Sequence, residues 1–95
     1  MDEDLKIVGE RLKKLRIERD LTMDMVITDI KKQFNVELQR GHLSKWENGI
    51  NVPSLRAAGL LCQYYRVSLD YLMGFTDSRV PVDLLAKTKR GKKNK

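Results

Sequence analysis

His42-Leu43-Ser44-Lys45-Trp46-Glu47-Asn48-Gly49 is the stretch that decides the fold of this chain. Read as one helix, it places apolar Leu43 and Trp46 on one face. The other face is polar and carries Arg40, His42, Ser44 and Lys45. Such a helix can bury one side in a small core and lay the other in the major groove of DNA, where side chains meet base edges. The stretch therefore favours sequence-specific DNA binding.

The chain before this stretch carries the pattern of two more helices. Apolar residues at spacings of three and four predict a first helix from about Asp4 to Arg19, ended by Asp20; the stripe is Leu5, Val8, Leu12 and Leu15. Thr22 can cap a second helix, which continues to Phe34 and looks unusually long.

The connection between the second and third helices is short. Asn35 can take a left-handed conformation and opens it, Leu38 closes it, and Gln39 begins the third helix.

The chain after this stretch predicts two more helices. Asn48-Gly49 ends the third helix, and Pro53 falls within the first turn of a fourth that runs to Tyr65. The predicted inner face of the fourth helix is Leu55, Ala58, Leu61, Cys62 and Tyr65. Ser68 caps a short fifth helix that ends near Met73-Gly74. No strand-length alternation and no internal repeat are visible, so the predicted class is all-α with five helices.

Length and charge suggest one small domain with a basic tail. The 95 residues fit a helical domain over 1–76 and a C-terminal extension over 77–95, with modest stability that oligomerisation would supplement. The net charge of +6 lies after residue 86, where the chain has six basic residues and no acidic residue. Such a tail attracts a polyanion such as nucleic acid, or is simply a solvated terminus.

Other sequence features bear on the compartment. Cys62 is the only cysteine, which fits a buried thiol in a reducing environment. The acidic start at Asp2, Glu3 and Asp4 is unlike a signal peptide, and no apolar run has membrane-spanning length. We therefore expect a cytoplasmic protein with no membrane partner.

Five helices in this order resemble the Cro and phage-repressor-like helix-turn-helix family, also called XRE. The resemblance covers roughly Leu5 to Gly74 and depends on short motifs: Arg11-Leu12-Lys13-Lys14-Leu15-Arg16, Leu21-Thr22, Leu43 to Gly49, Pro53-Ser54-Leu55 and Val67 to Leu72. It implies a lambda-repressor-like fold in which the second helix crosses the phosphate backbone and the third enters the major groove.

The resemblance also assigns contacts. It implies base reading by Gln39, Arg40, Gly41, His42 and Lys45, where Arg40 can pair with guanine and Gln39 with adenine. It implies phosphate contacts at Thr22, Met23, Ser44, Asn48 and Gly49, through side chains or backbone amides. Arg16 and Glu47 match positions that form a structural ion pair in the family.

The chain departs from the family pattern at several positions. Met23 stands where a glutamine commonly touches phosphate, Asp20 and Arg66 replace glycines, and Gly59 replaces an aliphatic residue. Gly41 occupies a position that often carries a base-reading side chain. It permits either a close approach to DNA or close packing of the third helix against the second. The stretch from Thr22 to Gln39 also exceeds the usual spacing.

Two aromatic residues of the central stretch have competing interpretations. Trp46 can stack on a base, but its spacing from Leu43 and the family's position favour the core. His42 is the only histidine and lacks neighbours with metal-ligand spacing, so we expect neither a metal nor a cofactor.

Function follows from these assignments as an expectation. One recognition helix covers few base pairs, so we expect a homodimer on a palindromic operator, acting as a repressor of transcription. The apolar residues Phe75, Val80, Val82, Leu84 and Leu85 are the predicted dimer contact. No catalytic constellation is recognisable, so we do not expect an enzyme. The alternative is an antitoxin that binds its toxin and represses its own operon, and a regulatory protein partner is compatible with either function.

Overall fold

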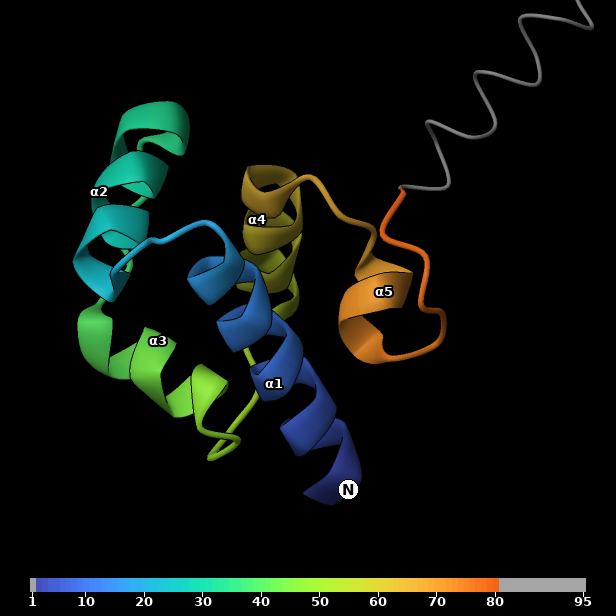
Figure 1. Ribbon diagram of the computed structural model, residues 1–95. Helices are drawn as coiled ribbons and strands as arrows, with labels where there is room; N and C mark the ends of the chain where they lie inside the picture. The colour runs from blue at the N-terminus through green and yellow to red at the C-terminus, as the bar shows by residue number, and fades with distance from the viewer. Residues whose placement is uncertain (1, 81–95) are drawn as a thin grey trace, which may run out of the picture.

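The computed structural model describes residues 2–80, with side chains from Lys6 onward. This part of the chain forms five α-helices and no strand: α1 (Asp2–Glu18), α2 (Met23–Phe34), α3 (Arg40–Glu47), α4 (Leu55–Tyr65) and α5 (Leu69–Met73). The predicted all-α class is confirmed. Figure 1 shows α1 between the α2–α3 pair on one side and α5 on the other.

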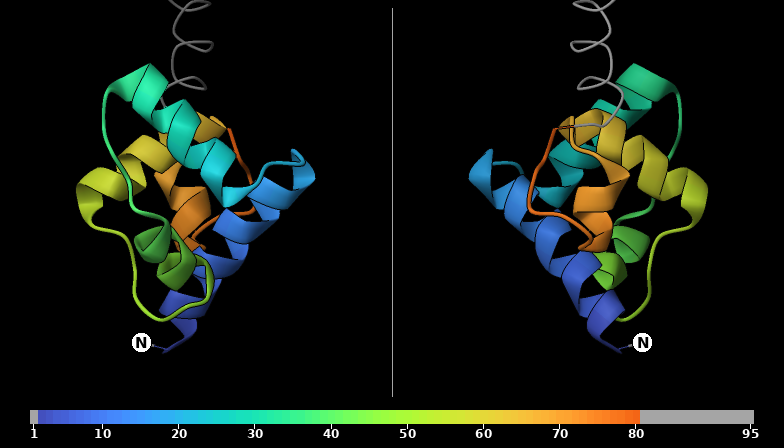
Figure 2. Two further views of the ribbon diagram at one scale, coloured as in Figure 1. Left: turned by 90° about the vertical axis from the view of Figure 1, so that its left-hand side faces the viewer. Right: turned by 90° about the vertical axis from the view of Figure 1, so that its right-hand side faces the viewer.

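The core surrounds the inner face of α1. Val8, Leu12 and Leu15 are buried as predicted, and they are the α1 members of a cluster to which every other helix contributes. Gly9 lies on the same helix, where a Cβ atom would stand 2.5 Å from the backbone oxygen of Trp46. Glycine at this position therefore lets α1 pack directly on the backbone of α3. Figure 2 shows the two helices side by side.

Side-chain caps begin three of the helices. Thr22, Ser54 and Ser68 each accept a hydrogen bond from a backbone N–H of the first turn of α2, α4 and α5. The caps at Thr22 and Ser68 agree with prediction. Asn35 has φ of 57° and ends α2 in the left-handed conformation, also as predicted.

The start of α4 differs from prediction. Ser54 is the N-cap, so the helix begins at Leu55 and Pro53 lies before it. Leu55, the first residue of α4, is 80% exposed and does not contribute to the inner face as predicted. Ala57, which was not predicted, is buried beside the predicted Ala58 and Leu61.

Two predictions about α2 and α3 also need correction. Gln39 has an extended backbone and is the N-cap, so α3 begins at Arg40. The 12 residues of α2 are an average helix length, not an unusual one. The long spacing between Thr22 and α3 includes the extended connection from Asn35 to Gln39.

Candidate nucleic-acid interface

The outward face of α3 is polar and accessible. Leu43, Trp46 and Glu47 are buried. At 3.6 residues per turn, the opposite side of the helix carries Gly41, Ser44, Lys45 and Asn48, with Arg40 and His42 at its edges. All but the half-buried Ser44 are exposed. Most of the predicted base readers therefore share one accessible surface, and Gln39 lies exposed at its N-terminal end.

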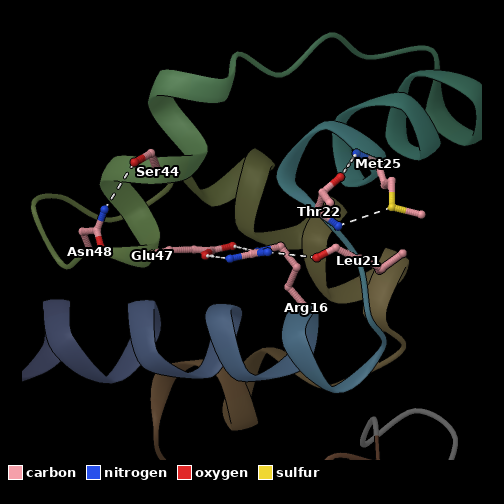
Figure 3. A network of polar contacts seen from close by, with 7 residues as sticks. All are labelled: Arg16, Leu21, Thr22, Met25, Ser44, Glu47 and Asn48. Atoms are coloured by element: carbon pink, nitrogen blue, oxygen red, sulfur yellow. Dashed lines mark hydrogen bonds and ion pairs between the residues drawn. The ribbon is translucent and has the colours of Figure 1, made fainter.

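An ion pair holds the C-terminal end of α3 to α1, as Figure 3 shows. Arg16 donates from Nε to Oε2 of Glu47 at 2.8 Å and from Nη2 to Oε1 at 2.9 Å. The third donor, Nη1, binds the carbonyl oxygen of Leu21 at 2.9 Å. The hydrogen bond to Glu47 raises the pKa of Arg16. One guanidinium thus connects α1, α3 and the residue before the α2 cap.

The N-terminus of α2 is closed by an unusual cap (Figure 3). Thr22 Oγ1 accepts from the backbone N–H of Met25 at 3.1 Å, and the N–H of Thr22 donates to the sulfur of Met25 at 3.4 Å. Sulfur is a weak acceptor, so this second contact leaves the amide with most of its capacity to bind an anion. The first two N–H groups of the helix, Met23 and Asp24, have no intrahelical partner.

Met23 differs from the other candidate phosphate contacts. Its side chain is partly buried and packs against the core, and a thioether donates no hydrogen bond. A phosphate contact at this position therefore has to use the backbone amide.

An acidic residue that sequence analysis missed lies beside the candidate base readers. Asp24 Oδ2 lies 3.3 Å from Nη1 of Arg40, and both side chains are well exposed. The pair joins the first turn of α2 to the first turn of α3. In the protein without DNA, Arg40 therefore has a carboxylate partner that a base or phosphate would have to replace. Asp24 and Arg40 lie sixteen residues apart in the sequence, so no local sequence pattern indicated this pair.

The aromatic pair of α3 agrees with the core interpretation of Trp46. Its side chain is only 8% exposed. The ring of His42 stacks on it, with centroids 6.2 Å apart and planes at 23°. Trp46 therefore supports the core and has little surface left for a base, while His42 remains exposed beside it.

The C-terminal end of α3 is partly engaged in its own contacts. The side-chain amide of Asn48 donates to Ser44 Oγ at 3.2 Å, which leaves the Asn48 carbonyl oxygen and the Ser44 hydroxyl hydrogen for other partners. The backbone N–H of Gly49 already donates to the carbonyl of Trp46 at 3.2 Å. In the protein without DNA the Gly49 amide is therefore already engaged, and a phosphate contact at Gly49 remains a prediction. With φ of 72°, Gly49 supplies the left-handed turn that ends α3.

Gly41 has no packing role within the described structure. A Cβ atom built on it meets no atom within 4 Å. The interpretation that Gly41 lets α3 pack closely against α2 is therefore wrong.

Comparison with known proteins agrees with this geometry. A family model described as helix-turn-helix matches residues 12–72, well over half of the chain. The chain belongs to this helix-turn-helix family, of the XRE type. A search of curated proteins found no match.

Membership makes this helix-turn-helix protein a DNA-binding regulator of transcription. The match includes α2, α3 and the Arg16–Glu47 pair, so it covers the surface described above. Within residues 2–80, no group of three His, Cys, Asp or Glu side chains is placed to hold a metal ion. None of the described helices is long and apolar enough to cross a membrane.

The predicted dimer contact lies only partly within the described part of this helix-turn-helix protein. Phe75 is 78% exposed and Val80 is 42% exposed. Val82, Leu84 and Leu85 lie outside the described residues. Phe75 borders an apolar groove of about 360 Å³ between α5 and the start of α4, lined also by Val52, Pro53, Leu55, Leu69 and Met73.

Proposed function

We propose that this helix-turn-helix protein is a repressor that binds a palindromic operator as a homodimer in the cytoplasm. The observation that carries the proposal is the rigid placement of α3. Its apolar face is buried, its end is held by the Arg16–Glu47 pair, and its polar face is open. A short helix fixed in this way can enter the major groove without reordering. Occupying a promoter is sufficient for repression.

The proposed roles of the side chains follow their position. Gln39, the N-cap of α3, and Arg40, its first residue, read bases. His42 and Lys45, which follow on the exposed side of α3, read bases as well. Thr22, Ser44 and Asn48, with the first amides of α2, bind phosphates and fix the register of the helix. Each good bidentate base contact contributes roughly 1–3 kcal/mol of discrimination.

Selection of bound duplexes from random DNA tests the proposed operator. We expect enrichment of a two-fold symmetric sequence whose half-sites lie about one helical turn apart. Arg40→Ala and Lys45→Ala should each weaken binding to that duplex about tenfold or more. Lys14→Ala is the matched control, because Lys14 lies on the α5 side of α1, away from α3. Recovery of no enriched sequence would contradict the proposal.

The groove beside Phe75 supports the proposed dimer. A two-fold interface uses the same patch on both copies, so in the proposed dimer the exposed ring of Phe75 and the apolar groove beside it would face the same features of the second copy. Leu55 and Phe75 are large, highly exposed apolar side chains at this groove, and their burial would stabilise a dimer.

Sedimentation of the full chain tests the dimer. Phe75→Ser should shift the protein toward monomer and weaken operator binding. Ile17→Ser removes another exposed apolar side chain outside the groove and should change neither. A wild-type protein that stays monomeric with and without operator would exclude the homodimer. If that monomer instead formed a stable complex with a toxin encoded beside it, the antitoxin alternative would be favoured.

A further inference from the structure

Gly41 occupies the outermost point of α3. The three buried residues of the helix define the direction of the core, and at 3.6 residues per turn Gly41 points almost directly away from it. Lys45 and Asn48 follow one and two turns later on the same side. The part of the helix that comes nearest to a duplex in the major groove is therefore bare backbone.

The backbone conformation of Gly41 does not require glycine. Its φ is not in the left-handed region, unlike those of Gly49 and Gly74, and a Cβ would meet nothing within 4 Å. Gly9, by contrast, is required by its contact with the backbone of Trp46. A glycine within a helix is less favourable than alanine, because it loses more backbone freedom on folding. Gly41 carries this cost with no gain inside the described structure.

We infer that Gly41 determines how deeply α3 enters the major groove, and therefore the specificity of base reading. The inference rests on the proposed function. With no side chain at the outermost point, the helix backbone can come into contact with the base edges. The longer side chains of Arg40 and Lys45, on either side of that point, then reach their partners at hydrogen-bond distance.

The physical reason is the narrow distance range of a hydrogen bond. Donor and acceptor have to lie within about 3.2 Å for full strength, and contacts near 3.6 Å no longer count as bonds. A methyl group at the outermost point would hold the helix axis away from the groove floor. Every direct base contact would lengthen together, whereas phosphate contacts made by flexible side chains would adjust.

The test compares Gly41→Ala with Gly59→Ala. Gly59 is also a helical glycine whose added Cβ would meet nothing within 4 Å, and it lies on α4. Both variants should melt at a higher temperature than the wild type. Gly41→Ala should bind the duplex selected by the wild type about tenfold or more weakly. Its affinity for a duplex of random sequence should be unchanged, and Gly59→Ala should match the wild type on both duplexes.

The result that would overturn the inference is wild-type affinity of Gly41→Ala for the selected duplex. An equal loss on the selected and the random duplex would also overturn it, because the effect would then not concern base reading. If the wild type enriches no duplex at all, the proposed function itself fails. A second selection with Gly41→Ala gives an independent readout, and enrichment of the wild-type sequence with undiminished affinity would again contradict the inference.

Discussion

At the scale of single residues, the Arg16–Glu47 pair connects stability to function. Glu47 is almost fully buried, with 2% of its side chain exposed, and Arg16 has 14% exposed. A charge pair in this environment contributes little net stability while both partners are present, but removing one leaves the other poorly compensated. The pair also fixes the end of α3, so its loss should affect DNA binding and folding together.

Glu47→Ala tests this coupling. We expect a loss of about 3 kcal/mol in the free energy of unfolding, with a lower melting temperature and weaker operator binding. Glu47→Gln retains an oxygen that accepts a hydrogen bond from Arg16, so it should lose less stability and less operator affinity than Glu47→Ala. Thermal melting and titration with the selected duplex measure the two effects. An unchanged melting temperature for Glu47→Ala would contradict the structural role.

Met25 offers a second test at the residue scale. It stands at the third position of α2, where glutamate or glutamine usually accepts from the N-cap amide, and here sulfur does so at 3.4 Å. Met25→Gln should therefore raise stability by about 0.5 kcal/mol, measured by urea denaturation. Met25→Glu should stabilise to a similar degree but weaken DNA binding, because it adds a negative charge beside the proposed phosphate site. Equal DNA affinities of the two variants would argue against a phosphate at this helix end.

Sequence patterns predicted the burial of a side chain correctly where that burial depends on spacing within one helix. The burial of Trp46 followed from its spacing to Leu43, and that of Leu12 followed from the α1 stripe. The approach of Gly9 to Trp46 and the pair of Asp24 with Arg40 depend on how two helices meet. Spacing along the chain carries no information about such contacts. Leu55 was misplaced because it keeps the apolar spacing of α4 but is the first residue of that helix, where spacing alone does not show whether the core still covers a side chain.

At the scale of elements, the helix ends store some strain. Asp20, Asn35 and Arg66 all have φ near 60°, a conformation that costs most residues roughly 1–2 kcal/mol. Asn35 tolerates it well, whereas Arg66, which ends α4, has no such advantage. The family resemblance indicated that glycine is usual at positions 20 and 66, and the observed left-handed conformations give the physical reason.

Arg66→Gly should therefore stabilise the protein. We expect a gain of about 1 kcal/mol in the free energy of unfolding, reduced by the greater freedom of glycine in the unfolded chain. Arg66→Ala removes the same side chain but keeps the strained backbone, so it should give no gain. Thermal melting of the two variants separates the conformational effect from the loss of charge. Equal melting temperatures of Arg66→Gly and Arg66→Ala would contradict the conformational effect.

The buried thiol of α4 predicts a dependence of stability on pH. Burial raises the pKa of Cys62 from 9.0 to about 11, because the charged thiolate is poorly solvated there. The folded state then holds its proton more tightly than the unfolded state, so stability is fully present below pH 9 and falls as the pH rises toward 11. Between pH 8 and 10.5, the wild type should lose up to about 2 kcal/mol more than Cys62→Ala in urea denaturation. If the wild type and Cys62→Ala lost the same stability over this pH range, the thiol would not contribute to the pH dependence.

At the scale of the whole molecule, α1 connects the DNA-facing side to the C-terminal segment. On one side it holds α3 through Gly9 and Arg16. On the other, Arg11 donates to the carbonyl oxygens of Tyr71 and Thr76, and Arg79 binds Glu18 at 2.8 Å and 2.9 Å. These contacts join residues 60 to 65 positions apart, and no sequence pattern indicated them. The ordered fold therefore extends past α5 to at least Arg79.

The charge distribution of the whole chain leads to a prediction about salt. Residues 1–86 have equal numbers of acidic and basic residues, and all of the net charge of +6 comes from Lys87 to Lys95. If this tail neutralises phosphates, the logarithm of the binding constant should fall with the logarithm of salt concentration by about 0.9 for each phosphate contacted. Deleting Lys87 to Lys95 should then flatten the slope by several such steps while the preferred sequence stays the same, because base reading belongs to α3. A variant with all six basic residues of the tail replaced by glutamine controls for the loss of chain length and should show the same slope. A slope unchanged by deletion would mean that the tail makes no phosphate contact, and that the neutral body supplies all of the electrostatic attraction through the local arrangement of its charges.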